Sequence, residues 1–382
     1  MRRNLQIGVG AAVSLVCLWL AFRGLELAEV GHALAGARYW LLVPALALYF
    51  AGVWVRAVRW RRLLLPVAAV PSSRLFPIVV IGYMANDVLP ARLGEVVRCY
   101  VLRRREGVPT SAGLGTVLLE RVMDGITMLA LMAVALPFLP FSPGLYRLMA
   151  GAAALFGVAV AVLVVLTTRP VLAARLVTAV TRAFPEGPRE RLAGFALSFF
   201  SGLAALGGVG PTLRIFLLSC GAWLLEAGMY LVLMFAFPMV PSVPLALLTT
   251  AVANLGTLIP ASPGYVGVFD FLGRSVLGQF GVPEATALAY VLVVHTALVL
   301  PVTLLGFWYT WRLGGLSLLR PATGPATGPA TGPATGPPAP ASAAGAGPAL
   351  EGAPGAQDVQ DVQDVQDVQD AQDVQEMQGA AR

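Results

Sequence analysis

Lysine is absent from this chain of 382 residues, and charged residues of any kind are scarce. All 26 basic residues are arginine, and charged residues make up 12% of the sequence. With 57% hydrophobic residues and a mean hydropathy of +0.77, the composition is too apolar for an ordinary soluble domain. The arginines flank apolar segments, as membrane topology requires, and form no separate basic domain, so no nucleic-acid partner is expected.

Cysteine is also rare, and the familiar cofactor motifs are missing. Cys17, Cys99 and Cys220 lie in or beside apolar stretches without CxxC spacing, which argues against a disulfide framework or a zinc site. The glycine-containing stretch 262–267 resembles neither a P-loop nor a dinucleotide fingerprint. We therefore expect no metal, no cofactor and no nucleotide-driven motor.

One broken apolar segment occurs twice. Residues 86–95 read Asn-Asp-Val-Leu-Pro-Ala-Arg-Leu-Gly-Glu, and residues 254–264 read Asn-Leu-Gly-Thr-Leu-Ile-Pro-Ala-Ser-Pro-Gly. A Gly-Val-Pro sequence then opens a long apolar segment at Gly107 and again at Gly281. Pro and Gly free backbone groups, which is tolerable at membrane depth only where protein or a water-filled cavity receives them. Paired breaks in two halves indicate a transporter-like site.

Eight apolar segments predict an all-α polytopic membrane protein. Six are long enough to cross about 30 Å of hydrocarbon, and they lie near residues 5–22, 40–58, 112–137, 149–168, 212–237 and 284–311. Two more, about 75–94 and 246–275, contain the breaks. We expect a membrane domain over residues 1–320, with one repeat at about 40–137 and a second at about 212–311.

Arginine placement predicts that both termini are cytoplasmic. Arg56, Arg59, Arg61 and Arg62 lie at the end of the predicted span 40–58 or just beyond it and are assigned to its cytoplasmic flank, as is the cluster 103–105. If the broken segments are re-entrant, an odd number of crossings separates the two copies, which makes an inverted repeat. If they cross fully, the chain has eight spans with the termini still inside. The sequence leaves both arrangements open.

The chain ends in a low-complexity, acidic tail. Residues 321–382 begin with Pro-Ala-Thr-Gly repeats, end in Gln-Asp-Val triplets and hold eight acids and one arginine. Such a composition cannot bury enough apolar surface to offset its ordering entropy, so it predicts disorder. The alternative is an acidic segment that docks a protein partner.

Three charged residues lie inside one apolar span. Glu120, Arg121 and Asp124 share a polar stripe of the predicted helix 112–137. Ionisable residues are costly at membrane depth, so the stripe requires partners or a wet cavity. It is interpreted as part of a translocation site, and the alternative is a buried ion cluster that locks helices together. The aligned position of the second repeat, His295, is also ionisable.

The first break carries further candidates. Asn86, Arg92, Glu95 and Arg98 surround it, with Asp87 beside them. A helix starting after Gly94 would direct its amides and dipole at the loop, where an anionic group could bind. The two arginines could add bidentate contacts to a phosphate, and the alternative is local ion pairing.

The second break offers a matching set. Ser262 and Gly264 precede Asp270 and Arg274, which have the i,i+4 spacing of a helical ion pair. Glu226 is interpreted as a core acid with satisfied hydrogen bonds.

With these motifs, the chain resembles the flippase-like family related to the transmembrane region of lysylphosphatidylglycerol synthases. The matching stretches are 86–98, 120–125 and 262–270. Asp270 stands where the family is expected to carry Glu. The aminoacyl-transferring domain of the synthases is not recognisable after the membrane region, so lysyl transfer is not expected. The resemblance implies a protein of the prokaryotic inner membrane that moves a lipid between leaflets.

The first hypothesis is therefore a flippase, not an enzyme, that moves an anionic or lipid-linked headgroup across the bilayer. A second is an integral-membrane transferase acting on a lipid headgroup with Glu120, Asp124 or His295 as base. A third is a non-catalytic membrane partner of cell-envelope enzymes that acts through the acidic tail.

Overall fold

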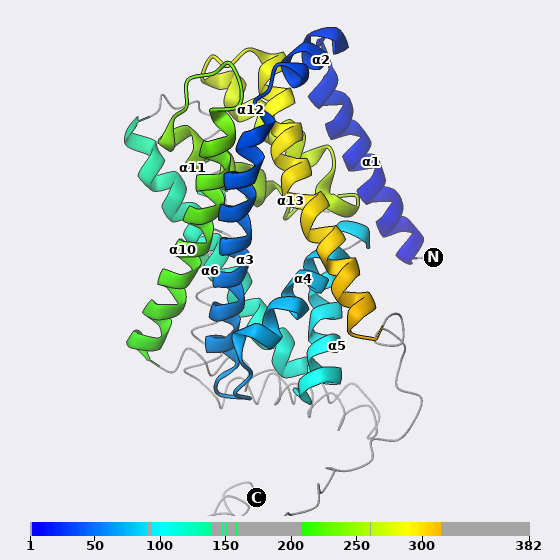
Figure 1. The fold of residues 1–382 in the computed structure, drawn as a ribbon, viewed down its shortest axis with the longest axis vertical. Coiled ribbons are helices and arrows are strands. Elements are labelled where there is room, and N and C mark those ends of the chain that lie inside the picture. The colour runs from blue at the N-terminus through cyan, green and yellow to red at the C-terminus, as the bar shows by residue number, and fades with distance from the viewer. Residues whose placement is uncertain are drawn as a thin grey trace, which may run out of the picture. The chain divides into compact units, whose positions relative to one another are not determined.

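The computed structural model describes residues 2–89, 93–138, 208–259 and 261–314, together with a few isolated positions between 147 and 158. In these residues every regular element is a helix (Figure 1). The elements are α1 (Arg2–Phe22), α2 (Leu27–Ala35), η1 (Tyr39–Leu41), α3 (Leu42–Leu64), α4 (Ser72–Val88), α5 (Gly94–Glu106), α6 (Thr110–Ala135), η2 (Leu136–Phe138), α10 (Val209–Met234), α11 (Val243–Gly256), η4 (Pro263–Tyr265), α12 (Val268–Gln279) and α13 (Glu284–Arg312).

Length and composition identify three of these helices as membrane spans. They cover Tyr39–Leu64, Gly210–Met234 and Glu284–Arg312, and Ala12–Phe22 and Val243–Gly256 are shorter apolar helices. α6 is equally long, but its intramembrane charges lower its apolar character. The prediction of an all-α polytopic membrane protein is confirmed. The predicted span 149–168 and the tail 321–382 lie outside the described residues.

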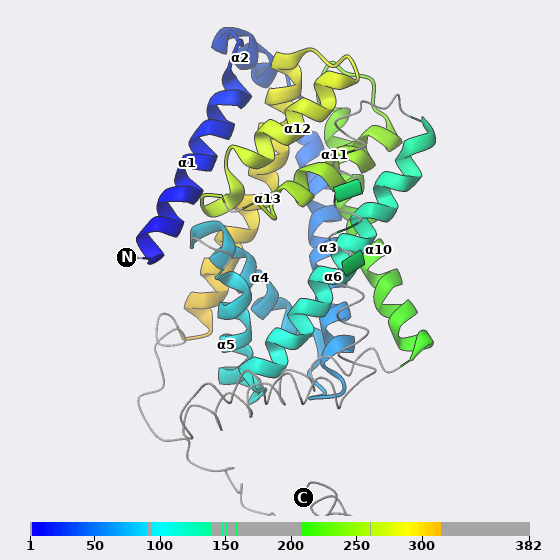
Figure 2. The same cartoon turned by 180° about the vertical axis from the view of Figure 1, so that it is seen from behind.

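The helices form two sets, α3 to α6 and α10 to α13, and helices of one set pack against helices of the other. α3 packs against α10, α4 against α13, and α6 against α11. Within each set, α5 lies between α4 and α6, and α12 lies between α11 and α13. α3 and α10 run in opposite directions, as do α6 and α13 (Figures 1 and 2). An inverted repeat produces this pattern of contacts.

Both broken segments turn back on themselves. α4 ends at Val88 and α5 leaves in the opposite direction, while α11 and α12 form the equivalent turn from the other side of the bundle (Figure 2). This arrangement agrees with the re-entrant alternative. In the second turn, Gly264 and Gly267 adopt φ of 69° and 87°, a region that glycine enters without strain.

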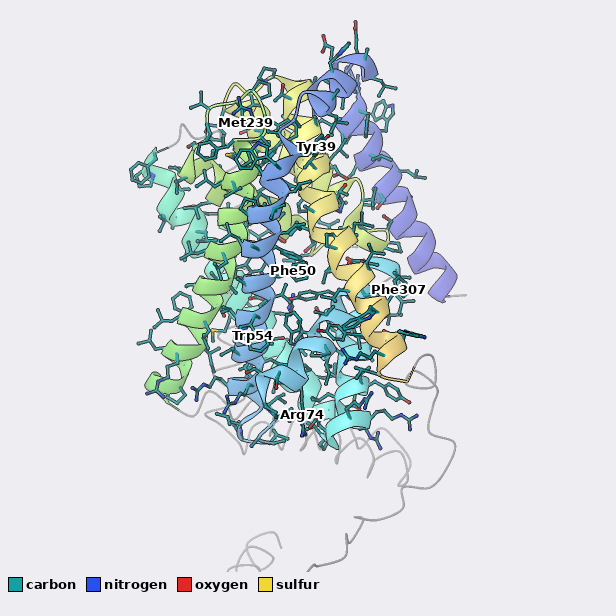
Figure 3. The ribbon with its side chains drawn as sticks, in the orientation of Figure 1. Tyr39, Phe50, Trp54, Arg74, Met239 and Phe307 are labelled. Atoms are coloured by element: carbon teal, nitrogen blue, oxygen red, sulfur yellow. The ribbon has the colours of Figure 1, made fainter. Side chains whose placement is uncertain are left out.

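Polar and apolar side chains are distributed as a bilayer requires. Trp54 and Phe307 point outward from the bundle and are about half exposed (Figure 3). Arg59, Glu120 and Asp270, in contrast, are almost fully buried. Since lipid solvates apolar side chains and excludes charge, the perimeter suits hydrocarbon and the interior holds the chemistry.

Candidate functional site

The two breaks meet at a polar pocket. α4 packs against η4, and the main chain of Gly264 faces the carbonyl oxygen of Asp87. A cavity of about 210 Å³ opens beside this contact, with walls from α3, α4, α6, α10, α11 and α13. Five of the residues predicted from the sequence line it: Asn86, Arg121, Asp124, Gly264 and His295.

Arg59 of α3 lies at the centre of the buried charge network. Its Nη1 is 2.5 Å from Oδ1 of Asp124, and its Nη2 is 3.3 Å from Oε1 of Glu120. Nη1 also donates to the hydroxyl of Ser219 on α10 at 2.7 Å. Trp223 adds a second donor to Oδ1 of Asp124 at 2.8 Å. One buried cation thus bridges two carboxylates of α6.

Glu120 is held behind the pocket by a second arginine. Arg98 of α5 forms an ion pair with Oε2 of Glu120. The guanidinium carbon of Arg98 lies 4.4 Å from the ring centre of Trp60, a cation–π contact. Trp60 in turn donates to Thr116 at 3.0 Å. Glu120 and Arg98 therefore bind α6 to α5 and do not reach the cavity wall.

Arg121 is paired more loosely. Its Nη2 lies 3.4 Å from Asp124 and its Nε 3.6 Å from Glu95, and its side chain is 32% exposed. These distances are long for hydrogen bonds, and Nε has no hydrogen-bond partner within the described part of the chain. Arg121 is therefore the arginine of the pocket wall best placed to bind an incoming anion.

Arg56 joins α3 to the second half of the molecule. It donates to Oε2 of Glu226 at 2.8 Å, and Asn254 donates to Oε1 of the same carboxylate at 3.2 Å. Glu226 thus has the satisfied hydrogen bonds predicted for it, and it also lines the pocket. The assignment of Arg56 and Arg59 to the cytoplasmic flank is wrong, because both are buried, at 4% and 0% exposure, as counterions of intramembrane carboxylates.

The first break is closed by Asn86. Its Oδ1 accepts a hydrogen bond from the amide of Gly94 at 2.9 Å, which caps the start of α5. This amide is consequently unavailable to the anion that the sequence placed there. Asp87 accepts a hydrogen bond from Thr303 of α13 at 2.8 Å and lines the cavity. Arg92 lies outside the described residues.

The second break is tied to α1, α12 and α13. The amide of Ser262 donates to Ser14 of α1 at 2.8 Å. His295 contacts Asp270 through Nδ1 at 2.8 Å and the carbonyl of Gly264 through Nε2 at 2.7 Å. The expected pairing of Asp270 with Arg274 is wrong: Arg274 forms an ion pair with Glu284 and donates to main-chain carbonyls at the end of α1.

Aromatic residues complete the wall and were not predicted from the sequence. Tyr49, Tyr83, Trp223 and Tyr265 line the cavity, and Tyr265 adopts an unusual positive φ of 59°. Aromatic residues are common in apolar spans, so no sequence signal separates the first three from lipid-facing ones, whereas Tyr265 lies within the stretch 262–270 of the second break. Within the described ranges, no cluster of three potential metal ligands is present.

Comparison with known sequences identifies the class of protein. The family described as the lysylphosphatidylglycerol synthase TM region matches residues 7–306, so the chain belongs to this family. The prediction made from the motifs of the two breaks and of α6 is confirmed.

Two curated proteins are similar to the chain. It is 28% identical over 327 residues to a protein of Haloferax volcanii named Glycosyltransferase AglD, a match that covers 77% of the chain and 52% of that protein. It is 40% identical over 50 residues to a UPF0104 membrane protein of Methanocaldococcus jannaschii, which covers 13% of the chain and 21% of that protein. The chain therefore spans about half the length of the first relative and less of the second.

The similarity to a protein named a glycosyltransferase corrects one expectation. The sequence was interpreted as that of a protein that is not an enzyme, and this interpretation is contradicted by the comparison. The family and the second relative support a multi-pass membrane protein.

Proposed function

We propose that the pocket binds the polar headgroup of an anionic or lipid-linked substrate and passes it between the leaflets of the cell membrane. The observation that carries this proposal is the position of the pocket at the meeting point of two re-entrant breaks. Irregular backbone in a membrane protein is tolerated where it lines a cavity, and transporter sites are built at such breaks.

Arg121 gives the pocket its contact for a phosphate. Its long contacts to Glu95 and Asp124 hold the guanidinium only weakly, and its side chain is partly exposed. Guanidinium groups bind phosphate oxygens through two parallel hydrogen bonds. The other arginine of the wall, Arg56, is held at 2.8 Å by Glu226 and is less available.

The remaining lining suits a polar headgroup with hydroxyl groups. Asn86, Asn254 and the tyrosines of the wall offer hydrogen bonds and aromatic faces. Asp87, Asp124 and Glu226 add acceptors. Because most of these charged groups are already paired with other residues, the pocket carries no large uncompensated charge.

The contacts between the two sets of helices provide a way to open the pocket to either side of the membrane. The packing of α4 on α13 and the packing of α6 on α11 both join one set of helices to the other, and the repeat makes these two contacts equivalent. Loosening one of these contacts while the other holds would open the pocket to one side of the membrane at a time. This is the rocking motion that inverted repeats support.

The glycosyltransferase name of one relative favours a second candidate, transfer of a sugar to or from a lipid-linked acceptor within the same pocket. His295 is poorly placed as the base for such a reaction because both ring nitrogens are engaged. Asp87, whose carboxylate accepts a hydrogen bond from Thr303, is the better candidate.

One experiment separates the two functions. Purified full-length protein is reconstituted into liposomes containing a fluorescent lipid, and a membrane-impermeant quencher measures leaflet exchange. Mass spectrometry of the same lipids, with and without a sugar donor, measures transfer. Exchange above that of protein-free liposomes supports translocation, a new lipid mass supports transfer, and the absence of exchange for anionic and glycan-linked lipids contradicts the first proposal.

A further inference from the structure

His295 bridges the second break and α12 through both of its ring nitrogens. Its Nε2 lies 2.7 Å from the carbonyl oxygen of Gly264, and its Nδ1 lies 2.8 Å from Oδ1 of Asp270. A carbonyl oxygen can only accept, so Nε2 carries a hydrogen. The other oxygen of Asp270, Oδ2, accepts from the amide of Gly267 at 2.9 Å.

The contact between Nδ1 and Oδ1 holds one further proton. Without it, two lone pairs would face each other at 2.8 Å. Whether this proton resides on His295 or on Asp270, the protonated Asp270–His295 pair has no net charge. Its loss leaves a net charge of −1 on groups whose side chains are only 9% and 1% exposed. Such an unpaired buried charge is unfavourable.

Loss of the proton also reduces the number of hydrogen bonds that His295 can make at the second break. A neutral imidazole has one N–H group for two acceptors. It must then release either the Gly264 carbonyl or the Asp270 carboxylate. Where the bond to Gly264 is the one released, the contact between the two breaks loosens, because Gly264 lines the pocket and faces the end of α4 at Asp87.

Other charged and titratable groups surround this pair. Asp87 from α4 faces His295 across the pocket, and within the described chain it has no arginine at ion-pair distance. It is the carboxylate placed to exchange a proton between pocket and pair. The remaining charged and titratable groups of the wall are Tyr49, Arg56, Tyr83, Arg121, Asp124, Glu226 and Tyr265.

We propose that the Asp270–His295 pair is the proton-binding site that couples headgroup movement to the proton gradient. This inference rests on the proposed translocation. The pair takes up one proton from the pocket, becoming neutral and holding the second break through two hydrogen bonds. It returns the same proton when the pocket faces the other side and gives up one of these hydrogen bonds, and no other covalent bond is made or broken.

A steady-state leaflet assay tests the coupling. With one proton moved per headgroup, a gradient of one pH unit represents about 1.4 kcal/mol and shifts the distribution of the lipid between leaflets by about tenfold. In liposomes containing the full chain and a fluorescent anionic lipid, this shift is expected with the gradient and is abolished when an ionophore dissipates it. In Asp270→Asn, the gradient should leave the distribution unchanged, whatever the rate of exchange.

Glu284→Gln is the matched control. Glu284 is an ionisable residue of the same helix as His295, but it is exposed, pairs with Arg274 and does not line the pocket. This variant should keep the full shift. Retention of the shift in Asp270→Asn would overturn the proposal, and so would its loss in Glu284→Gln.

A spectroscopic measurement tests the proton site independently of lipid movement. The chain has two histidines, so His32→Gln leaves His295 as the one ¹⁵N-histidine signal. Titration should show both ring nitrogens protonated or sharing a proton, followed by a single-step loss at one of them. A bare ring nitrogen at every pH at which the protein stays folded would overturn the proton site. The expected titration without leaflet exchange would contradict the proposed function and leave the proton site standing.

Discussion

Arg59 and Asp124 are 65 positions apart in the chain, yet Nη1 of the arginine lies 2.5 Å from Oδ1 of the aspartate. This pair joins α3 to α6 beneath the pocket, and Trp223 of α10 donates to the same carboxylate oxygen. The intramembrane acids of α6 are therefore neutralised chiefly by Arg59 of α3 and Arg98 of α5, and only loosely by their neighbour Arg121.

Replacing Arg59 with Gln should destabilise the protein strongly. The substitution leaves Asp124 and Glu120 without their shared counterion, and removing one partner of a buried ion pair typically costs about 3 to 5 kcal/mol. Thermal unfolding of the purified protein in detergent measures the loss. Arg61→Gln, an exposed position of the same helix, is the control and should unfold near the parent temperature. Equal stability of the two variants would show that Arg59 does not hold the cluster.

Replacing Arg121 with Gln should affect lipid exchange more than stability. Its partly exposed, long ion pairs are each worth less than about 1 kcal/mol. Loss of a charge-assisted hydrogen bond to a phosphate removes about 1.5 to 3 kcal/mol, which corresponds to roughly tenfold or more in binding. Liposome exchange titrated with an anionic lipid measures the change, with Arg61→Gln again as control. Unchanged exchange would remove Arg121 from the headgroup site.

Sequence reasoning located the breaks because proline and glycine disrupt helices locally. The turns between Val88 and Gly94 and between Gly256 and Val268 fall where Pro-Ala-x-x-Gly occurs twice. The pairing of α4 with α13 and of α6 with α11 could be inferred only from the repeat, since these contacts join distant segments.

The partners of the charged residues could not be read from local spacing. Arg56 and Arg59 follow an apolar run, as topology-determining arginines do, so their burial was missed. A count of intramembrane charges could have found them, because Glu120, Asp124 and Glu226 need more cations than Arg121 supplies. The i,i+4 spacing from Asp270 to Arg274 was misleading because the close partner of Asp270, His295, lies on another helix.

Gly94→Ala should disrupt the first break. A β-carbon at Gly94 would overlap the carbonyl oxygen of Gly82 and lie 2.6 Å from Oδ1 of Asn86. Overpacking of this kind costs about 1 to 3 kcal/mol. Gly221→Ala in α10, where nothing lies within 4 Å of the added carbon, is the control and should be neutral or stabilising. Detergent unfolding compares the two, and a stable Gly94→Ala would mean that α5 is not packed against α4 as described.

A double-mutant cycle on Arg56 and Glu226 separates packing from headgroup binding. Arg56→Gln alone leaves a buried carboxylate held by Asn254 and should cost about 3 to 5 kcal/mol, whereas Arg56→Gln with Glu226→Gln removes both charges and should recover most of that loss. The exposed pair of Arg74 and Glu106, 3.4 Å apart, is the matched control, and its removal should cost less than about 1 kcal/mol.

Lipid exchange by the stable double variant then decides the role of this pair. If the pair contributes to the pocket surface that receives the headgroup, exchange should stay well below that of the parent although stability has returned. If its role is to hold α3 against α10, exchange should recover together with stability. Full recovery of exchange would therefore remove Arg56 and Glu226 from the headgroup site and leave Arg121 as the arginine that binds the headgroup.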